Sequence, residues 1–333
     1  MSFDERLALA VNRLPGHRGW PKRRAWELCR DEHDLAGAVD AYLRDPAVRV
    51  RGDAPDASGL LREAETESRR LRQFGISCRV LGEEGYPASL AAIDDPPFVL
   101  YVRGTLGEGA KPAVALVGTR RPSAAAGRQA FRLGLEFSFA GYPVVSGLAF
   151  GIDKAAHEGA LAAKGATWAV LAGGLDRPSP MAHRKLAGRI LDGGGALVGE
   201  MPPGRFPGKY AFPRRNRILS GLCRGCVVVQ APEKSGALIT ADFALEQGRD
   251  LYVADAGLEG LPSDGTRSLE AQGAPVIRGA ADVMGDWGRF LDVRAVSPAR
   301  PPESGGDLAW MMKSELQGRM HRFMGGWFEY RGA

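Results

Sequence analysis

The chain has 333 residues, 44% of them hydrophobic, which is enough for a sizeable core and for about two domains. A formal net charge of +5, four cysteines and the lack of a long apolar run exclude a small disulfide-stabilised scaffold and a membrane-spanning protein. The start, with Asp4, Glu5 and Arg6, is not typical of a secretory signal. We therefore expect a soluble, cytoplasmic protein that does not engage a membrane.

The first 75 residues have a helical pattern. Helices are predicted near the start, over residues 22–29 and over residues 60–74, with a loop at 49–59. From Ile76 the period of the apolar residues changes to that of a strand. We place a domain boundary there, so that residues 1–75 form a small helical N-terminal domain.

Residues 76–288 alternate between strand-like and helix-like runs. Strands are predicted at residues 78–81, 98–102, 113–117, 144–145, 168–171, 196–198, 227–230, 251–253 and 276–277. Helices are predicted at residues 124–140, 154–164, 182–191, 214–222, 238–247 and 267–272. Such alternation predicts an α/β fold with a mostly parallel sheet covered on both faces, which is a Rossmann-like architecture.

The pattern weakens after about Trp287. Residues 289–306 are predicted to be a linker, because Pro, Gly and Ser dominate residues 297–306. Residues 307–333 form a C-terminal tail, in which residues 308–328 have the spacing of an amphipathic helix. We expect this helix to dock on the body of the protein or on a partner.

Glycine-bearing turns follow several of the predicted strands and precede helices. In a parallel sheet these turns meet at the carboxyl edge, where such sheets bind ligands. Gly118 would let the backbone approach a phosphate, Arg120 would add a charged fork, and Ser123 is placed to cap the next helix. The other turns contain Ser146-Gly147, Gly173-Gly174 and Ser235-Gly236.

Residues 202–224 form a basic segment with six cationic residues and no Asp or Glu. The cations are Arg205, Lys209, Arg214, Arg215, Arg217 and Arg224. Three aromatic residues, Phe206, Tyr210 and Phe212, are interleaved with them. Cationic side chains combined with aromatic faces favour single-stranded nucleic acid, because its phosphates pair with the cations and its bases stack on the rings.

Two further pairs of residues could have a catalytic or redox role. Asp153 and His157 lie four residues apart on a predicted helix and could form an acid–base pair, but we expect Asp153 to cap that helix and His157 to pack beside it. Cys223 and Cys226 are either a redox couple or buried structural cysteines, and the second interpretation is favoured. Since no nucleophile or metal-ligand cluster is assembled, we expect no enzyme, no cofactor and no metal.

Four motifs occur in one order along the chain, preceded by a similar approach segment at residues 95–104. They are Gly118-Thr119-Arg120-Arg121-Pro122-Ser123, Ser146-Gly147-Leu148-Ala149-x-Gly151-Ile152-Asp153, Phe212-Pro213-x-Arg215-Asn216-Arg217 and Ser235-Gly236-x-Leu238-Ile239-Thr240. With these motifs the chain, from about Tyr86 to Gly273, resembles the DNA-processing protein A family (DprA, also called Smf).

The resemblance implies an extended Rossmann fold, with a SAM-like helical domain at the N-terminus, that binds single-stranded DNA. It also implies a homodimer that hands the strand to the recombinase RecA during natural transformation. By this likeness, the phosphate-binding pocket would be lined by Arg120, Ser146, Gly147, Arg215, Asn216 and Arg217 and extended by Lys209 and Arg214.

The chain departs from the family pattern at several places. Phe150 stands where the family usually has an arginine, which removes one phosphate contact but offers an aromatic face on which a base could stack. Asp255-Ala256-Gly257 replaces the usual Val-Pro-Gly, and the winged-helix module of many members is not recognisable after Gly306. These departures concern DNA affinity and recombinase loading rather than the fold.

Two other functions remain open from the sequence. One is a nucleotide-binding or nucleoside-monophosphate-hydrolysing protein on the related lysine-decarboxylase-like Rossmann fold, in which Glu200 or Asp153 would assist glycosidic-bond cleavage. The other is a protein-binding scaffold that acts through its N-terminal helices and its C-terminal tail.

Overall fold

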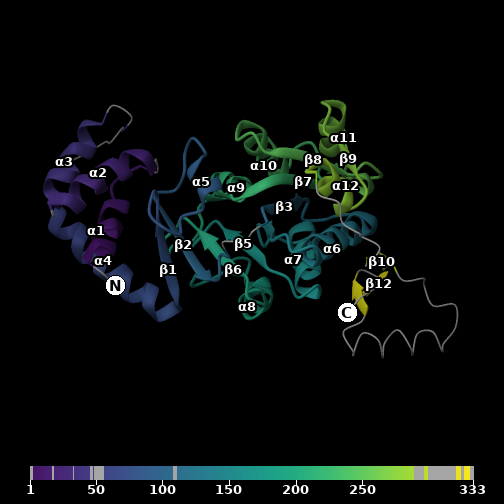
Figure 1. Cartoon of the computed structure of the whole chain (residues 1–333), viewed down its shortest axis with the longest axis horizontal. Coiled ribbons are helices and arrows are strands. Elements are labelled where there is room, and N and C mark those ends of the chain that lie inside the picture. Colours follow the sequence, from purple (N-terminus) through teal and green to yellow (C-terminus); the bar gives the residue numbers. More distant parts are fainter. Residues whose placement is uncertain are drawn as a thin grey trace.

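The structure is a computed structural model that describes residues 3–16, 19–32, 34–45, 48, 56–107, 111–288, 296–298, 320–323 and 326–330. Figure 1 shows a group of helices from the N-terminal part of the chain beside a large twisted sheet. Helices cover both faces of that sheet (Figure 1). None of the helices described is both long and apolar enough to cross a membrane.

The N-terminal part contains helices α1 (Phe3–Asn12), α2 (Gly19–Glu32), α3 (Leu35–Arg44) and α4 (Ala57–Phe74). Aspartates start two of them: Asp34 accepts a hydrogen bond from the Gly37 amide, and Asp56 accepts from the amides of Ser58 and Gly59. Gly75, in the left-handed conformation at φ 61°, ends α4. The first strand follows directly, at Ile76.

The main sheet has nine strands in the order β1-β2-β6-β5-β4-β3-β7-β8-β9. From β6 to β9 all neighbours are parallel, whereas β2 is antiparallel to both β1 and β6. This confirms the mostly parallel α/β fold expected from the alternation. The strands are β1 (Ile76–Val80), β2 (Val99–Gly104), β3 (Ala113–Gly118), β4 (Val144–Ser146), β5 (Thr167–Leu171), β6 (Ala196–Gly199), β7 (Cys223–Gln230), β8 (Asp250–Ala254) and β9 (Val276–Ile277).

The helices divide between the two faces of the sheet (Figure 1). Helices α6 (Ala124–Phe139), α7 (Ile152–Ala162) and α8 (Arg184–Asp192) lie on one face, and α9 (Ala211–Gly221) and α10 (Gly236–Glu246) lie on the other. Strand β3 serves both layers, because successive side chains of a strand point to opposite faces. Val114 and Leu116 pack with α6 and α7, whereas Ala115 and Val117 join the core under α9 and α10.

Shorter elements complete the sheet region. They are the helices α5 (Ala88–Ala91), α11 (Asp264–Ala271) and α12 (Ala280–Asp286) and the 3₁₀ turns η1 (Met181–His183) and η2 (Asp255–Gly257). The amphipathic pattern did not predict α3 or α12, both of which are short. Ser123 caps α6 as expected, since its hydroxyl accepts from the Ala126 amide at 3.1 Å.

The prediction of a helix over residues 308–328 is wrong for the part of that range that the structure describes. Residues 320–323 form β11 (Met320–Phe323) and residues 326–330 form β12 (Gly326–Tyr330), which pair antiparallel. Strand β10 (Val296–Pro298), within the expected linker, pairs with β12. Aromatic residues favour strands and glycine disfavours helix interiors, so Gly326-Trp327-Phe328 suits a strand. The remaining tail and linker residues lie outside the described part of the chain.

Candidate anion-binding site

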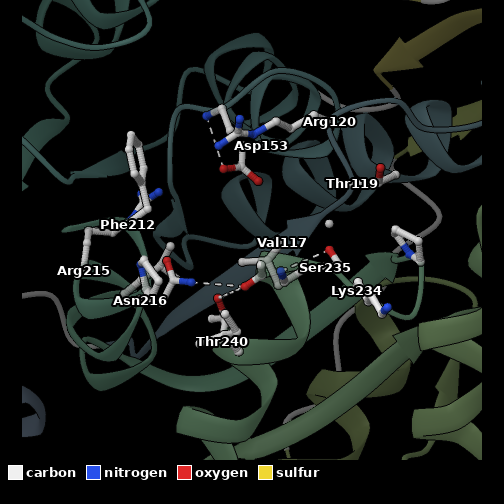
Figure 2. Close-up of a pocket in the computed structure, with 18 of the residues that line it drawn as sticks. Val117, Thr119, Arg120, Asp153, Phe212, Arg215, Asn216, Lys234, Ser235 and Thr240 are labelled. Atoms are coloured by element: carbon white, nitrogen blue, oxygen red, sulfur yellow. Dashed lines mark hydrogen bonds between the residues drawn. The ribbon is translucent and has the colours of Figure 1, made fainter. Parts of the chain in front are cut away.

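A cavity of about 490 Å³ lies where the strand order of the sheet reverses. The chain proceeds from β3 through β4, β5 and β6 to one side and then returns to pair β7 with the other side of β3. Open parallel sheets bind ligands at such a switch point, outside the carboxyl ends of the strands. The end of β3, the start of α9 and the start of α10 line the cavity (Figure 2).

Gly118 ends β3 at the base of this cavity. A Cβ atom there would lie 2.6 Å from Ile152 Cγ1 and 2.8 Å from the Gln230 carbonyl oxygen. The next residue, Thr119, donates its amide to the same carbonyl at 2.7 Å. The glycine therefore allows β3, β7 and α7 to converge, which is a packing role in addition to the expected approach of a phosphate.

Three cations with exposed side chains border the cavity: Arg120, Arg121 and Lys234. Figure 2 shows Arg120 above it and Lys234 at its right. None of the three forms an ion pair with any residue that the structure describes. An unpaired cation beside a cavity is available to a bound anion, so these three residues set the electrostatic character of the site.

The amino end of α10 adds another source of positive potential. Its N-cap residue Ser235 accepts a hydrogen bond from the Ala237 amide at 3.2 Å. A Cβ atom on Gly236 would have no neighbour within 4 Å, so the backbone at this helix start faces open space. The first turn of a helix presents free N–H groups and the positive end of the dipole, which together favour an anion.

Arg215 reaches the cavity from α9, as expected. Its guanidinium lies against Gly147, where a Cβ atom would be 2.2 Å from Nη1, and it donates to the Val170 carbonyl. Desolvation lowers the pKa of Arg215, and the nearby Asp153 carboxylate opposes that shift. Gly147 therefore contributes space for the arginine rather than a contact of its own.

Asp153 fixes the turn between β4 and α7 instead of capping the helix. Its Oδ2 accepts from the amides of Gly147 at 3.1 Å and Ala149 at 3.2 Å, while Gly151 is the N-cap residue. Burial raises the pKa of Asp153, and Arg215 opposes this rise. The carboxylate is therefore committed to holding the turn, and its charge is offset by the arginine.

His157 is fully buried, and its hydrogen bond is to Thr167 rather than to Asp153. Its Nδ1 donates to Thr167 Oγ1 at 2.7 Å, since the Thr167 hydroxyl itself donates to the Val144 carbonyl. Burial lowers the pKa of His157 to about 3. The two residues do not form an acid–base pair, in agreement with the structural interpretation.

Arg217 does not line the cavity. The residue is only 4% exposed, and its guanidinium pairs with Asp95 at 3.1 Å and with Glu200 at 2.8 Å. Arg214, one turn earlier, pairs with the same Glu200 oxygen at 2.9 Å. Both arginines therefore pair with a carboxylate of the protein itself, Glu200, rather than being free to bind a phosphate.

This pairing also bears on Glu200, which was considered for glycosidic-bond cleavage. Its Oε1 accepts hydrogen bonds from both Arg214 and Arg217, so the carboxylate is engaged in holding these two side chains of α9. Lys22 from α2 lies nearby, fully buried, and donates to the Asn12 carbonyl at 2.7 Å. Burial lowers the pKa of Lys22 to about 8, and Glu200 opposes that shift.

A second pocket of about 270 Å³ adjoins the first through Arg215, which lines both. Lys209, Tyr210 and Arg214 line it beside the carboxyl ends of β5 and β6. Lys209 and Tyr210 are exposed, so they extend the cationic and aromatic character of the first pocket along the same edge of the sheet.

Ser146 and Asn216 serve the scaffold. Ser146 is fully buried and donates its hydroxyl to the Leu116 carbonyl at 2.6 Å, so its side chain does not reach the cavity. Asn216 lines the cavity but donates to the Gly236 carbonyl at 3.1 Å, which ties α9 to the start of α10 (Figure 2). Phe150, on the turn after β4, is half-exposed and contacts the ring of His183.

The cysteine pair has the structural character that was favoured from the sequence. Cys223 and Cys226 are both buried and not joined by a disulfide, and Cys223 Sγ donates to the Leu219 carbonyl at 3.2 Å. Burial raises the pKa of both thiols, that of Cys226 to about 12. Across the described residues, no three His, Cys, Asp or Glu side chains gather as a metal-binding group.

The glycine turns and Arg215 were predictable from the sequence as neighbours at one edge of the sheet, but Lys234 was not. The only signal for Lys234 is its position directly before the cap of α10, at a strand-to-helix turn. The mostly parallel sheet defines a Rossmann-like protein of the α/β class, and the unpaired cations and helix start at its switch point make this cavity a candidate site for an anion.

Comparison with known proteins gives the family. Residues 77–288 match the family model of the DNA recombination-mediator protein A, and the chain belongs to this family. It is 40% identical to the DNA processing protein DprA of Bacillus subtilis over 216 residues, which cover 64% of this chain and 72% of that protein.

Two solved structures are also similar. The X-ray structure of DprA from Streptococcus pneumoniae has a TM-score of 0.67 and 29% identity, covering 86% of this chain and 98% of that one. DprA from Helicobacter pylori, whose structure concerns its single-stranded DNA binding mode, has a TM-score of 0.57 and 29% identity, covering 64% of this chain and 96% of that one.

Proposed function

We propose that this chain binds single-stranded DNA in the cavity between β3 and β7. The observation that carries the proposal is the set of unpaired cations, Arg120, Arg121 and Lys234, at a cavity that also receives the amino end of α10. These groups would bind consecutive phosphates. The single-stranded DNA binding of the Helicobacter pylori relative supports the same ligand.

The shape and lining of the cavity favour a single strand over a duplex. A volume of about 490 Å³ is that of a pocket for one small molecule, so it would admit a splayed nucleotide but not a double helix. Phe212, 36% exposed, and Ile239 provide apolar surface beside the cations. An unpaired base can stack on such an aromatic face, whereas a base within a duplex is already stacked.

In this proposal the protein works by binding rather than by catalysis. It protects incoming single-stranded DNA as a cytoplasmic homodimer and hands the strand to the recombinase RecA during natural transformation. Family membership supports the mediator role. A RecA strand-exchange assay would test it: adding this protein should speed joint-molecule formation, and no change in rate would contradict the mediator role while leaving DNA binding intact.

The DNA site itself is tested by fluorescence anisotropy with a labelled oligothymidylate at two salt concentrations. Each phosphate contact on a single strand contributes about 0.7 to the slope of log affinity against log salt. The variant Arg120→Gln/Lys234→Gln should therefore lower this slope by about 1.4. Arg189→Gln, an exposed arginine in the last turn of α8, is the matched control and should leave it unchanged. Binding of the oligothymidylate by the wild type with an affinity that does not change with salt would contradict the proposal.

A further inference from the structure

Phe150 is an exposed aromatic side chain on the edge of the sheet where the cavity lies. It follows Ala149, which lines the cavity, and it precedes Gly151, where an added Cβ atom would collide with the backbone of Thr119 and Arg120. The ring is 46% exposed. A half-exposed ring at this edge is available to a ligand that binds there, and an aromatic ring offers that ligand a large apolar surface.

One side of the Phe150 ring is supported by His183. The two ring centroids are 4.5 Å apart at an interplanar angle of 57°. His183 is only 4% exposed and donates from Nδ1 to the Leu148 carbonyl at 2.7 Å, which fixes its ring beneath Phe150. The aromatic surface is therefore held from below and open above.

The backbone that carries Phe150 is also fixed. Leu148 on one side has φ 58° and Gly151 on the other has φ 77°. The carboxylate of Asp153 holds this turn through the amides of Gly147 and Ala149. A ring on a rigid turn needs little ordering when a ligand arrives, so more of its contact energy appears as affinity.

We infer that Phe150, supported by His183, is a base-stacking platform, through which this chain contacts the bases of its ligand as well as the phosphates. The inference rests on the proposed function, since it concerns the same single strand. The cavity beside Arg120 holds the phosphate, and the neighbouring base lies flat on the Phe150 ring. Stacking of this kind is indifferent to base identity but absent for a polyanion that has no bases.

The test compares an oligothymidylate with an abasic oligomer of the same length, which has the same phosphates without the bases. Phe150→Ala should weaken binding of the oligothymidylate by about 5- to 150-fold, the range measured for one stacked base, and leave the abasic oligomer unaffected. Phe150→Leu keeps apolar packing on His183 without a π-face and should behave like Phe150→Ala. Phe150→Tyr keeps the face and should bind like the wild type.

Phe139→Ala is the matched control. Phe139 is also a phenylalanine, 44% exposed, but it ends α6 at the opposite edge of the sheet. If the wild type binds oligothymidylate and Phe150→Ala weakens it no more than Phe139→Ala does, the platform is refuted and the DNA site stands. An equal loss on both oligomers would also refute it, because the effect would then not depend on bases. Failure of the wild type to bind any oligothymidylate would refute the proposed function itself.

Discussion

Replacing Arg217 tests whether this residue binds phosphate, as its motif suggests, or stabilises the fold, as its ion pairs indicate. The motif places Arg217 among phosphate-binding residues, but its guanidinium pairs with Asp95 and Glu200 and is nearly inaccessible. We predict that Arg217→Met lowers the free energy of unfolding and leaves the DNA affinity of the folded protein within about twofold of wild type, a difference of less than about 0.5 kcal/mol.

The expected loss follows from the partners left behind. Removing one member of a buried ion pair costs about 3–5 kcal/mol, because the remaining charge is buried without compensation. Here Glu200 keeps Arg214, and the Asp95 side chain is 29% exposed and so partly solvated. Both facts place the loss near the lower end, at about 3 kcal/mol.

Urea unfolding followed by circular dichroism measures this loss, and anisotropy with oligothymidylate under native conditions measures the affinity. Glu200→Gln should reduce the effect of Arg217→Met in a double-mutant cycle, with a coupling of about 0.5–3 kcal/mol. An Arg217→Met variant with the urea midpoint of the wild type and a flattened salt dependence of DNA binding would refute the reasoning, because Arg217 would then serve the ligand.

Three further predictions concern stability. Gly118→Ala should lower the free energy of unfolding by about 1–3 kcal/mol, because the added methyl overpacks against Ile152 and a backbone carbonyl. Gly236→Ala has open space around the added methyl and should not lower it. Equal urea midpoints for the two variants would contradict this prediction. The pKa of His157 is about 3 in the folded state and 6.5 in the unfolded state. As the pH falls below 6.5, the free energy of unfolding of the wild type should therefore decrease by about 1.4 kcal/mol per pH unit relative to His157→Gln. Parallel curves of stability against pH would contradict this prediction. The pKa of Lys22 is about 8 in the folded state and 10.5 in the unfolded state. Raising the pH from about 8 to about 10.5 should therefore stabilise the wild type relative to Lys22→Met by about 3 kcal/mol. A stability difference between the two proteins that does not change with pH would contradict this prediction.

Much of the fold could be predicted because parallel strands covered on both faces are short, nearly continuous apolar runs. The strand β7 is an example, with Val227-Val228-Val229 fully buried. All nine strands of the main sheet were predicted in this way. The C-terminal pairing of β11 and β12 was not, because aromatic residues at roughly helical spacing also suit a strand.

The site was predicted less completely, for a reason that lies in long-range contacts. Arg215 and Arg217 are equivalent in the sequence, yet one borders the cavity and the other pairs with Asp95, which is 122 residues away. Neighbouring sequence cannot show which partner an arginine meets. Ser146 likewise begins a glycine-turn motif, but it directs its hydroxyl to the Leu116 carbonyl of the adjacent strand.

The most direct test of the account is photocrosslinking of the wild-type protein to an oligonucleotide that contains 5-bromodeoxyuridine, followed by mass spectrometry of the tryptic peptides. The account predicts crosslinks in peptide 210–214, which contains Tyr210 and Phe212 at the two pockets. Crosslinks confined to the helices of residues 3–74, with none at the carboxyl edge of the sheet, would contradict the claim that the switch-point cavity binds single-stranded DNA.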